Sequence, residues 1–550
     1  MPLDDLVLGL QRLVDRFVRR VRRGRAPTPD RKRLLVVQID GLSREVLQLA
    51  LARGRMPFLR RVIERAGWRL HPMFVGLPSS TPAFQMAAMY GVRPDIPGFH
   101  YHDKRHREDV YFPRAGDAAR VEKAQAAGRR GILDGGASYG CVFTGGAVDN
   151  LFTFAIMKRP TGSGLLAAFS ALVVLAWVAL KSTVITATEL LRAVLRLLAD
   201  PVGEWRRGWK WLAIKIGLSV WVRELFTLAV ARDLYAGTPS IYVNYLDYDV
   251  FSHAYGPRHR RALRSLRRID DSLKQIWRVC RRVPEHRYDL YVLSDHGQAH
   301  TRLFDEVAGG RRFERVVFDD FFTPGGARPV SPARPAGRHR LASGIKALRT
   351  GRAPGYFQRF FNYIEEGFPW VLGELKEARE RDNVRVICAG PNAFIYFVDD
   401  DAPLPIERIE ERWPGLADEL SRHPGVGYVF ARSSSDGPVC FWRGKRHRLS
   451  LAEPGPFAGR ADTPLVISAI RDLMTMPSAG DLVVYGIDAS TGHVSYIAEA
   501  GAHAGPSPEE LHTFVVAPPA ARLPEPLDHP VQLYPHFARY LDGSTRESAA

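Results

Sequence analysis

Two pairs of acidic and histidine side chains in this sequence have the spacing of metal ligands. Asp295 and His296 are adjacent and follow an apolar run at residues 290–293, so they can offer one oxygen and one nitrogen to a metal ion. Asp249 and His253 are four residues apart, and one helical turn places such a pair on one face. The Asp295–His296 pair equally fits a turn with a helix cap, so it does not identify a site by itself.

Three other residues could join them. Asp40 ends an apolar run at 34–39, and His503 lies among small residues, where a histidine is a poor core residue and a reachable ligand. Thr81 precedes a proline that favours the first turn of a helix. Backbone N–H groups at a helix N-terminus attract an anion, so the Thr81 hydroxyl could attack phosphorus there. The alternatives are helix capping by Asp40 or by one of the three hydroxyls at 79–81, and an incidental loop position for His503.

The elements that must position these residues are predicted from apolar runs bounded by polar residues. Such runs are typical of parallel strands that are buried on both faces. They lie at 34–39, 139–144, 240–246, 290–293 and 513–517, with helical patterns at 44–66 and 260–282. We therefore expect an α/β fold with a central, mostly parallel sheet flanked by helices. Ligands bind beyond the carboxyl ends of the strands in such sheets, so the acids and histidines at those ends are expected to meet.

Composition limits the classes of partner and site. The 550 residues suffice for one large domain with insertions, or for two to three domains. A net charge of +18 and a pI near 9.9 indicate an anionic partner, which could be nucleic acid, anionic lipid or a phosphate-bearing substrate. The four cysteines are dispersed, which argues against a disulfide framework and a thiolate zinc site and fits a reducing compartment.

Residues 1–30 have no signal-peptide pattern, because no apolar core precedes a small-residue cleavage site. Apolar residues recur at helical spacing from Leu3 to Val21, and seven arginines fill other positions up to Arg25. A basic amphipathic helix of this kind is typical of a membrane-surface element, although a helix packed on the protein's own core has the same pattern.

A second apolar and basic segment, residues 151–238, interrupts the predicted catalytic domain, and its tryptophans alternate with basic residues as at a membrane interface. Its run at 165–180 would cover about 24 Å as a helix, less than the roughly 30 Å of a hydrocarbon core. Candidate ligands precede and follow the segment in the sequence. If they share one site, the chain must cross the membrane an even number of times. The second crossing, at about 212–231, would carry charged residues. We favour a monotopic or re-entrant helical hairpin over a two-helix span or a helical cap on the enzyme.

Five short motifs contain the candidate residues in one order along the chain. They are Gln38-Ile39-Asp40-Gly41, Ser80-Thr81-Pro82, Asp249-x-x-x-His253-x-x-Gly256-Pro257, Ser294-Asp295-His296-Gly297 and Gly501-x-His503. Together they resemble the alkaline phosphatase superfamily, in its type I phosphodiesterase/nucleotide pyrophosphatase branch. The resemblance spans roughly residues 33–519, without 151–238 and about 305–380. It implies an alkaline-phosphatase-like fold, to which a helical membrane-associating insertion is added.

The resemblance also implies a role for each candidate residue and a need for two divalent metal ions, zinc in this family. One ion, beside Thr81, would be held by Asp40, Asp295 and His296. The other would be held by Asp249, His253 and His503. Thr81 would attack phosphorus and form a phospho-enzyme intermediate that water resolves. A threonine at this position argues against the sulfatase branch, which needs a cysteine or serine there.

Two departures from the family pattern limit this transfer of roles. Family members often place an asparagine about twenty residues after the nucleophile to bind a phosphate oxygen, and here His102 or Lys104 could take that place. Alanines flank His503 where the family usually has serine and glycine, so the ligand is kept while its surroundings change.

The predicted organisation is an amphipathic helix and linker at 1–30, catalytic segments at 31–150, 239–304 and 381–520, the insertion at 151–238, a lid-like insertion at 305–380 and a tail at 521–550. The predicted function is a membrane-associated, two-metal phosphodiesterase or nucleotide pyrophosphatase with its catalytic domain in the cytoplasm. Its partners would be a nucleotide or lipid-linked phosphodiester and an anionic membrane surface, without specific nucleic-acid recognition. The alternatives are a phosphoethanolamine-type transferase, which would transfer to an acceptor alcohol, and a catalytically silent membrane-binding homologue, which would hold no metal.

Overall fold

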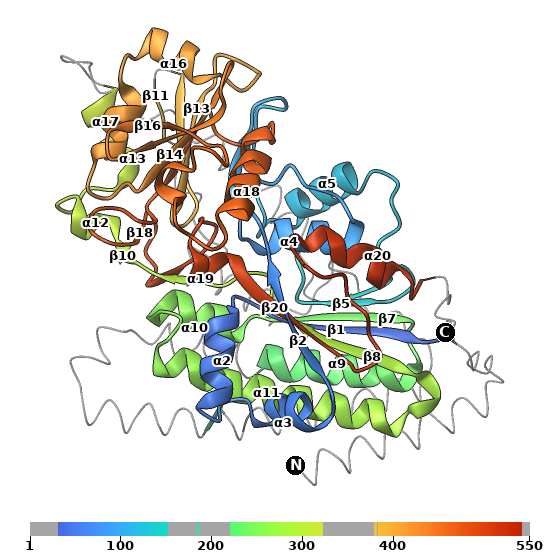
Figure 1. The fold of residues 1–550 in the computed structure, drawn as a ribbon. Helices are drawn as coiled ribbons and strands as arrows, with labels where there is room; N and C mark the ends of the chain where they lie inside the picture. The colour runs from blue at the N-terminus through green and yellow to red at the C-terminus, as the bar shows by residue number, and fades with distance from the viewer. Residues whose placement is uncertain are drawn as a thin grey trace.

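The central element is a seven-stranded sheet with the order β2-β20-β8-β1-β7-β5-β6 (Figure 1). The computed structural model describes residues 31–151, 183, 186–187, 221–322, 379–381 and 383–541. The strands of this sheet are β1 (Arg33–Ile39), β2 (Arg69–Phe74), β5 (Ala137–Tyr139), β6 (Asp149–Leu151), β7 (Ser240–Tyr245), β8 (Tyr288–Leu293) and β20 (His512–Ala517). The five strands from β8 to β6 are parallel. β20 is antiparallel to both of its neighbours, β8 and the edge strand β2. The prediction of an α/β fold with a mostly parallel sheet is confirmed.

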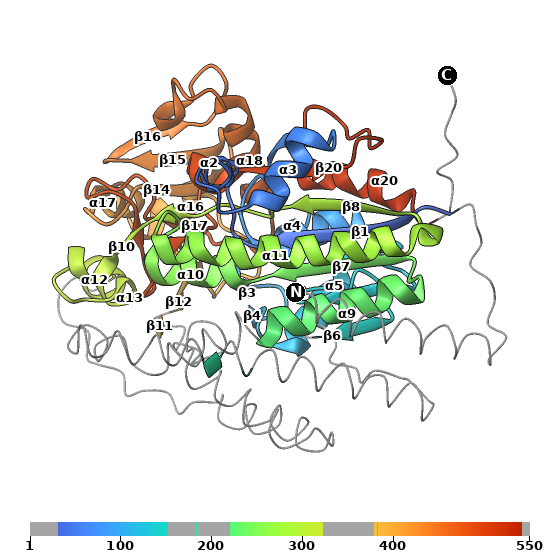
Figure 2. The same cartoon turned by 90° about the horizontal axis from the view of Figure 1, so that it is seen from below.

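Helices cover both faces of this sheet, which explains why its strands are continuous apolar runs. Side chains of β1 alternate between the two cores: Leu34 and Val36 face one, while Leu35, Val37 and Ile39 face the other. The first face is covered by α4 (Thr81–Tyr90), α5 (Ala115–Ala126) and α20 (Leu533–Ala538). The opposite face is covered by α2 (Arg44–Ala52), α3 (Pro57–Arg65), α9 (Arg223–Ala236) and α11 (Arg260–Arg282) (Figures 1 and 2).

A second seven-stranded sheet, entirely antiparallel, forms a lobe of its own, which we call the second lobe. Its strands, in spatial order, are β11 (Arg379–Arg381), β12 (Val384–Cys388), β13 (Asn392–Phe397), β17 (Leu482–Tyr485), β14 (Tyr428–Ser433), β15 (Gly437–Trp442) and β16 (Lys445–Arg448). α16 (Ile406–Arg412) and α17 (Leu416–Arg422) bury one face, and α18 (Thr463–Thr475) buries the other. The sequence predicts a hairpin of 384–388 and 393–398 and further short strands at 425–432 and 438–442, and β12 and β13 form that hairpin.

Short elements connect the lobes and carry the loops discussed below. They are α10 (Asp247–Tyr255), β9 (Ala299–His300), β10 (Arg302–Leu303), α12 (Phe304–Val307), α13 (Phe313–Val316), β18 (Val494–Ser495), β19 (Gly501–Ala502) and α19 (Pro508–Leu511). β10 pairs with β18, and β9 pairs with β19, so the chain from 299 to 303 runs beside the chain from 494 to 502. A hairpin of β3 (His100–Asp103) and β4 (Glu108–Tyr111) precedes α5.

Two segments differ from the predicted domain borders. α9 lies within the range predicted for the insertion, 151–238, but its side chains Phe226, Val230 and Leu234 are buried in the core between β7 and α11. Leu533 and Phe537 of α20, in the predicted tail, are fully buried against α4. No helix within the described part of the chain is long and apolar enough to cross a membrane. The predicted N-terminal helix and most of the predicted insertion lie outside the described residues.

Asp270 of α11 ties that helix to the first turn of α3. Its carboxylate is buried and accepts hydrogen bonds from the backbone N–H groups of Phe58 (2.8 Å) and Leu59 (2.9 Å). Because Asp270→Ala leaves two buried donors without acceptors, we expect it to lower the free energy of unfolding in urea by about 1–3 kcal/mol. Asp271→Ala, which removes the partly exposed neighbour, should change it by no more than about 0.5 kcal/mol. Equal effects would contradict this role.

Candidate active site

The candidate ligands from the first half of the fold follow three adjacent parallel strands. Asp40 directly follows β1, Asp295 and His296 follow β8 after one residue, and Asp249 and His253 lie on α10, which follows β7. Since β8, β1 and β7 are neighbours and run in the same direction, their carboxyl ends lie at one edge of the sheet. The backbone therefore brings these side chains to one place.

His503 and Thr81 reach the same place through a contact between two loops. The imidazole of His503 donates from Nδ1 to the carbonyl oxygen of Ser79 (2.9 Å), and the N–H of Ala504 donates to the Ser79 hydroxyl (3.0 Å). Ser80 is the N-cap residue of α4 and Thr81 begins the helix, with a proline in its first turn as the sequence indicated. His503 is thus held by Ser79, which lies two residues before Thr81 in the chain.

Thr81 lies within hydrogen-bonding distance of the first group of candidate ligands. Its hydroxyl donates to Asp40 Oδ1 at 3.4 Å and lies 3.2 Å from His296 Nε2. The same His296 nitrogen is 3.4 Å from Asp40 Oδ1 and 3.4 Å from Asp295 Oδ2. Thr81, Asp40, Asp295 and His296 are all buried. Three donor groups therefore converge around one hydroxyl.

The second group surrounds Asp249. Its Oδ2 is 3.3 Å from Nε2 of His253, and the ring of His253 lies 5.1 Å, centre to centre, from that of His503. His503 in turn stacks on His296 at 3.7 Å. Gly41 has a left-handed φ of +74°, and a Cβ there would lie 2.5 Å from Asp249 Oδ1, so the glycine after Asp40 leaves room for this carboxylate.

Two sets of donor atoms lie close enough together to hold an ion. Asp40, Asp295 and His296 form one set within 4.8 Å, as the family pattern implied. The other consists of Asp249, His503 and His296, so His296 borders both positions. His253, expected in the second set, is not part of it, although its Nε2 lies 3.3 Å from Oδ2 of Asp249. Oxygen and imidazole nitrogen donors in sets of three suit zinc-type ions.

Burial governs the protonation of these groups. Burial and the carboxylates of Asp295 and Asp249 raise the pKa of Asp40 well above its ordinary value, and burial raises the pKa of Asp295 to about 7. Burial lowers the pKa of His296 to about 4 and that of His503 to about 3, so both imidazoles are neutral at pH 7 and able to bind a metal. Asp295 Oδ2 is buried without a hydrogen bond. Such a cluster suits a divalent cation.

Three orienting residues were missed by the sequence analysis. Asn244 in β7 donates from Nδ2 to Asp40 Oδ2 (2.6 Å), Gln298 donates from Nε2 to Asp249 Oδ1, and Glu499 lies 2.9 Å from His253 Nδ1. The signal for Asn244 was available: it is a polar residue inside an apolar strand. Gln298 and Glu499 lie in loops that showed no pattern.

His102 and Lys104, predicted to bind substrate, are not brought to this cluster. His102 Nδ1 faces Asp109 Oδ1 at 2.8 Å within the β3–β4 hairpin. Lys104 is buried in an ion pair with Asp481 (3.0 Å) and donates to the carbonyl of Ala402 (2.8 Å), which ties the hairpin to the second lobe. Within the described residues, no recorded contact joins either side chain to Thr81 or a candidate ligand, so their predicted role gains no support.

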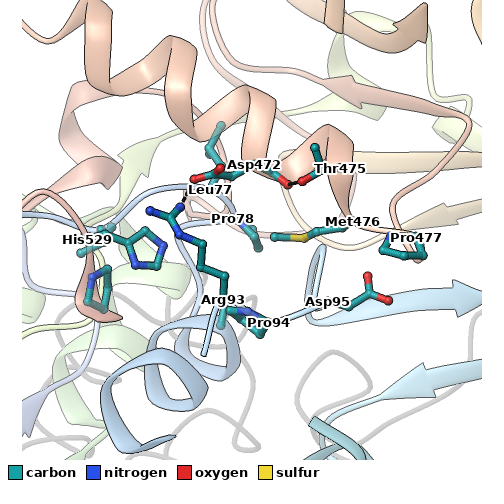
Figure 3. A pocket seen from close by; sticks show the side chains of 13 residues that line it. Leu77, Pro78, Arg93, Pro94, Asp95, Asp472, Thr475, Met476, Pro477 and His529 are labelled. Carbon is teal, nitrogen blue, oxygen red and sulfur yellow. Dashed lines mark hydrogen bonds and ion pairs between the residues drawn. The ribbon is translucent and has the colours of Figure 1, made fainter. Parts of the chain in front are cut away.

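A pocket of about 160 Å³ lies beside the loop that precedes α4 but is separate from the cluster (Figure 3). Leu77, Pro78, Met476 and His529 are among its lining residues, and Arg93 reaches toward Asp472 across it. Neither Thr81 nor any of the six candidate ligands lines it. The site is therefore identified by its carboxylate and imidazole donor groups and not by this pocket.

Comparison with known proteins identifies the family of the chain. Residues 34–347, more than half of the chain, match the family model described as type I phosphodiesterase/nucleotide pyrophosphatase. No curated protein matches the chain. Solved structures of phosphonoacetate hydrolase from Sinorhizobium meliloti 1021, with phosphonoacetate and with phosphonoformate, are each 14% identical, with TM-scores of 0.47 and 0.46. Each match covers 94% of this chain and 97% of the other. On the strength of the family match, the chain belongs to the type I phosphodiesterase/nucleotide pyrophosphatase family and is a metal-dependent phosphoric ester hydrolase.

Proposed function

We propose that this hydrolase is a two-metal phosphodiesterase in which Thr81 is the nucleophile. The observation that carries the proposal is the position of the Thr81 hydroxyl, 3.2 Å from His296 Nε2 and 3.4 Å from Asp40 Oδ1. A nucleophilic alcohol needs a group that lowers its pKa, and a metal ion held by these donors would do so.

The donor sets fit two ions. Asp40, Asp295 and His296 would hold the one beside Thr81. Asp249, His253 and His503 would hold the other, with His296 at the border between them. When bound, zinc ions would act as Lewis acids toward the attacking oxygen, the leaving oxygen and the transferring phosphoryl group.

The chain's own groups account for the remaining steps. The backbone N–H groups at the start of α4 face the anion, as is usual for a helix N-terminus. Thr81 Oγ1 forms a bond to phosphorus as the bond to the leaving alcohol breaks, and the Thr81 proton ends on that alcohol. The intermediate is a diester of Thr81 that keeps the second alcohol of the substrate. Water then cleaves its bond between phosphorus and Thr81 Oγ1, which restores the hydroxyl and releases the phosphate monoester. The substrate is a phosphodiester, either a nucleotide or a lipid-linked one.

Membrane association is the second part of the proposal. It is supported by the basic residues of α3 and α11, two helices that cover the same face of the sheet (Figures 1 and 2). Basic residues on these helices are Arg60, Arg61, Arg65, Arg260, Arg261, Arg264, Arg267, Arg268, Lys274, Arg278, Arg281 and Arg282. Besides buried Asp270, the acids on them are Glu64 and Asp271. With the amphipathic sequence at 1–30, the basic residues of the two helices favour anionic lipid.

Thr81→Ala should lower kcat for bis(p-nitrophenyl) phosphate, measured with zinc, by about 10³-fold or more, because the attacking oxygen is removed. Thr81→Ser should keep part of the activity. Thr475→Ala, which changes an exposed threonine on α18, serves as the control and should match the unaltered enzyme. If Thr81→Ala retained full activity, Thr81 would not be the nucleophile. Adding an acceptor alcohol tests the transferase alternative, which requires transfer to exceed hydrolysis.

In the metal-free enzyme, the contribution of Asp295 to stability should fall as pH rises from about 4 to about 7. Burial raises the pKa of Asp295 from 3.8 to about 7, so the folded protein binds this proton more tightly than the unfolded chain does. The resulting stability is fully present below pH 3.8 and is lost as pH passes 7. Asp295→Asn should remove this part of the pH dependence of Tm in the presence of chelator. Zinc should raise Tm more at pH 7.5 than at pH 5, because the ligands bind it unprotonated.

Charge reversal on α11 tests the membrane surface. Arg264→Glu together with Arg267→Glu should weaken co-sedimentation with phosphatidylcholine vesicles containing phosphatidylglycerol, and salt should weaken it further. Lys445→Glu with Arg471→Glu, on exposed residues of the second lobe, is the matched control. Equal losses in both pairs would indicate a response to net charge alone, and no binding to anionic vesicles would contradict membrane association.

A further inference from the structure

The outer nitrogens of the three candidate histidine ligands meet different partners. Nδ1 of His296 faces the carbonyl oxygen of Gly297 at 3.0 Å, and Nδ1 of His503 faces that of Ser79 at 2.9 Å. Nδ1 of His253 faces the carbonyl oxygen of Gly501 at 2.8 Å and also Oε2 of Glu499 at 2.9 Å. Among these three histidines, His253 alone has a recorded contact between its outer nitrogen and a carboxylate.

Both neighbours of His253 Nδ1 are hydrogen-bond acceptors, so this nitrogen carries the hydrogen. Nε2 points toward Asp249 Oδ2 at 3.3 Å, and it offers its lone pair when a cation takes the place of its hydrogen. This is the tautomer in which His253 and Asp249 can bind the same cation. The Gly501 carbonyl would be enough to select it. What Glu499 adds is negative charge, which strengthens the hydrogen bond and makes Nε2 a better electron donor.

Glu499 is itself held in place from several directions. It is 7% exposed, and the Ser495 hydroxyl donates to its Oε1 at 2.8 Å, so each carboxylate oxygen has a partner. The Thr301 hydroxyl donates to its backbone carbonyl at 3.2 Å. The N–H of Ala500 donates to the carbonyl of His253 at 2.7 Å, which fixes this loop against α10.

The loop that carries Glu499 also contacts the second lobe. Ser495 belongs to β18, and the next residue, Tyr496, donates its backbone N–H to the carbonyl of Gly390 at 2.8 Å. Gly390 lies in the turn between β12 and β13, and its Cβ position is 3.4 Å from Glu499 Oε1. The carboxylate is therefore positioned by elements that lie outside the parallel sheet.

We propose that Glu499 is a positioning residue of the metal centre: its carboxylate holds His253 with Nε2 toward Asp249 and strengthens that nitrogen as a ligand. The proposal rests on the two-metal function above. It makes the two ion positions unequal. The ion held by Asp249, His253 and His503 has a ligand that Glu499 supports, and the ion beside Thr81 has none. Ser495 acts one step further out, by holding the carboxylate.

Zinc titration of the stripped protein against a chromophoric chelator tests this role. The unaltered chain should bind two ions. In Glu499→Gln the affinity for one ion should fall by about 10–100-fold, while the other ion binds as before. Ser495→Ala should weaken the same ion by a smaller factor. Glu306→Gln, which neutralises an exposed glutamate of α12, is the matched control and should bind both ions normally.

Two further measurements separate positioning from folding. The Tm of the metal-free Glu499→Gln protein should stay close to that of the unaltered chain. When cobalt replaces zinc in both proteins, the visible spectrum of one of the two ions should differ between Glu499→Gln and the unaltered chain. Unchanged affinity for both ions would overturn the role of Glu499, and so would equal weakening of both ions with a large fall in Tm. Failure of the unaltered chain to bind metal would instead contradict the two-metal function itself.

Discussion

The crowding of three carboxylates at one edge of the sheet, two of them buried and one partly exposed, is the constraint on which the site depends. Asp40, Asp249 and Asp295 are close enough for each to affect the ionisation of another, in surroundings where little water can screen them. Such a cluster is unfavourable unless positive charge is supplied. His253 supplies some of it beside Asp249, and a bound cation would supply the rest. Ligation and stability are therefore two aspects of one arrangement.

Short polar contacts hold this cluster together across the chain. α19 joins two ligand loops: the Glu510 backbone carbonyl accepts from the N–H of Gly297 (2.8 Å), and its buried side chain accepts from the N–H of Gly505 (2.7 Å). A Cβ at Gly297 would lie 1.9 Å from the carbonyl oxygen of Glu509, so the glycine after His296 is needed for this close approach. These contacts make the position of His296 depend on that of His503.

The second lobe contributes to the site without supplying a candidate ligand. Its turn at Gly390 lies against the loop that carries Glu499, and Lys104 of the β3–β4 hairpin is neutralised by Asp481 next to β17. The buried Lys104–Asp481 pair fixes the hairpin against the lobe, since removing either partner would leave an unpaired charge in the interior. Lys104 has a side chain of the type that binds phosphate, but here it holds the hairpin against the second lobe.

The types and order of the ligands, and the strands that carry them, could be predicted from the sequence. An apolar run that ends in an acid indicates a buried parallel strand with a functional end, and β1, β7 and β8 follow that rule. The antiparallel second sheet could not be predicted as one unit, because β17, late in the chain, joins the β12–β13 hairpin to β14, and such distant pairing leaves no local pattern.

Only the tertiary structure decided which residues surround the ligands. Asn244, Gln298 and Glu499 act through single hydrogen bonds to residues 204, 49 and 246 positions away, and such contacts leave no local periodicity. His296 borders both ion positions, although the motifs assign it to one. The local sequence determines which chemical groups are available and at which strand ends they lie. Their partners are set by packing between segments that are distant in the chain, and packing is a property of the folded molecule alone.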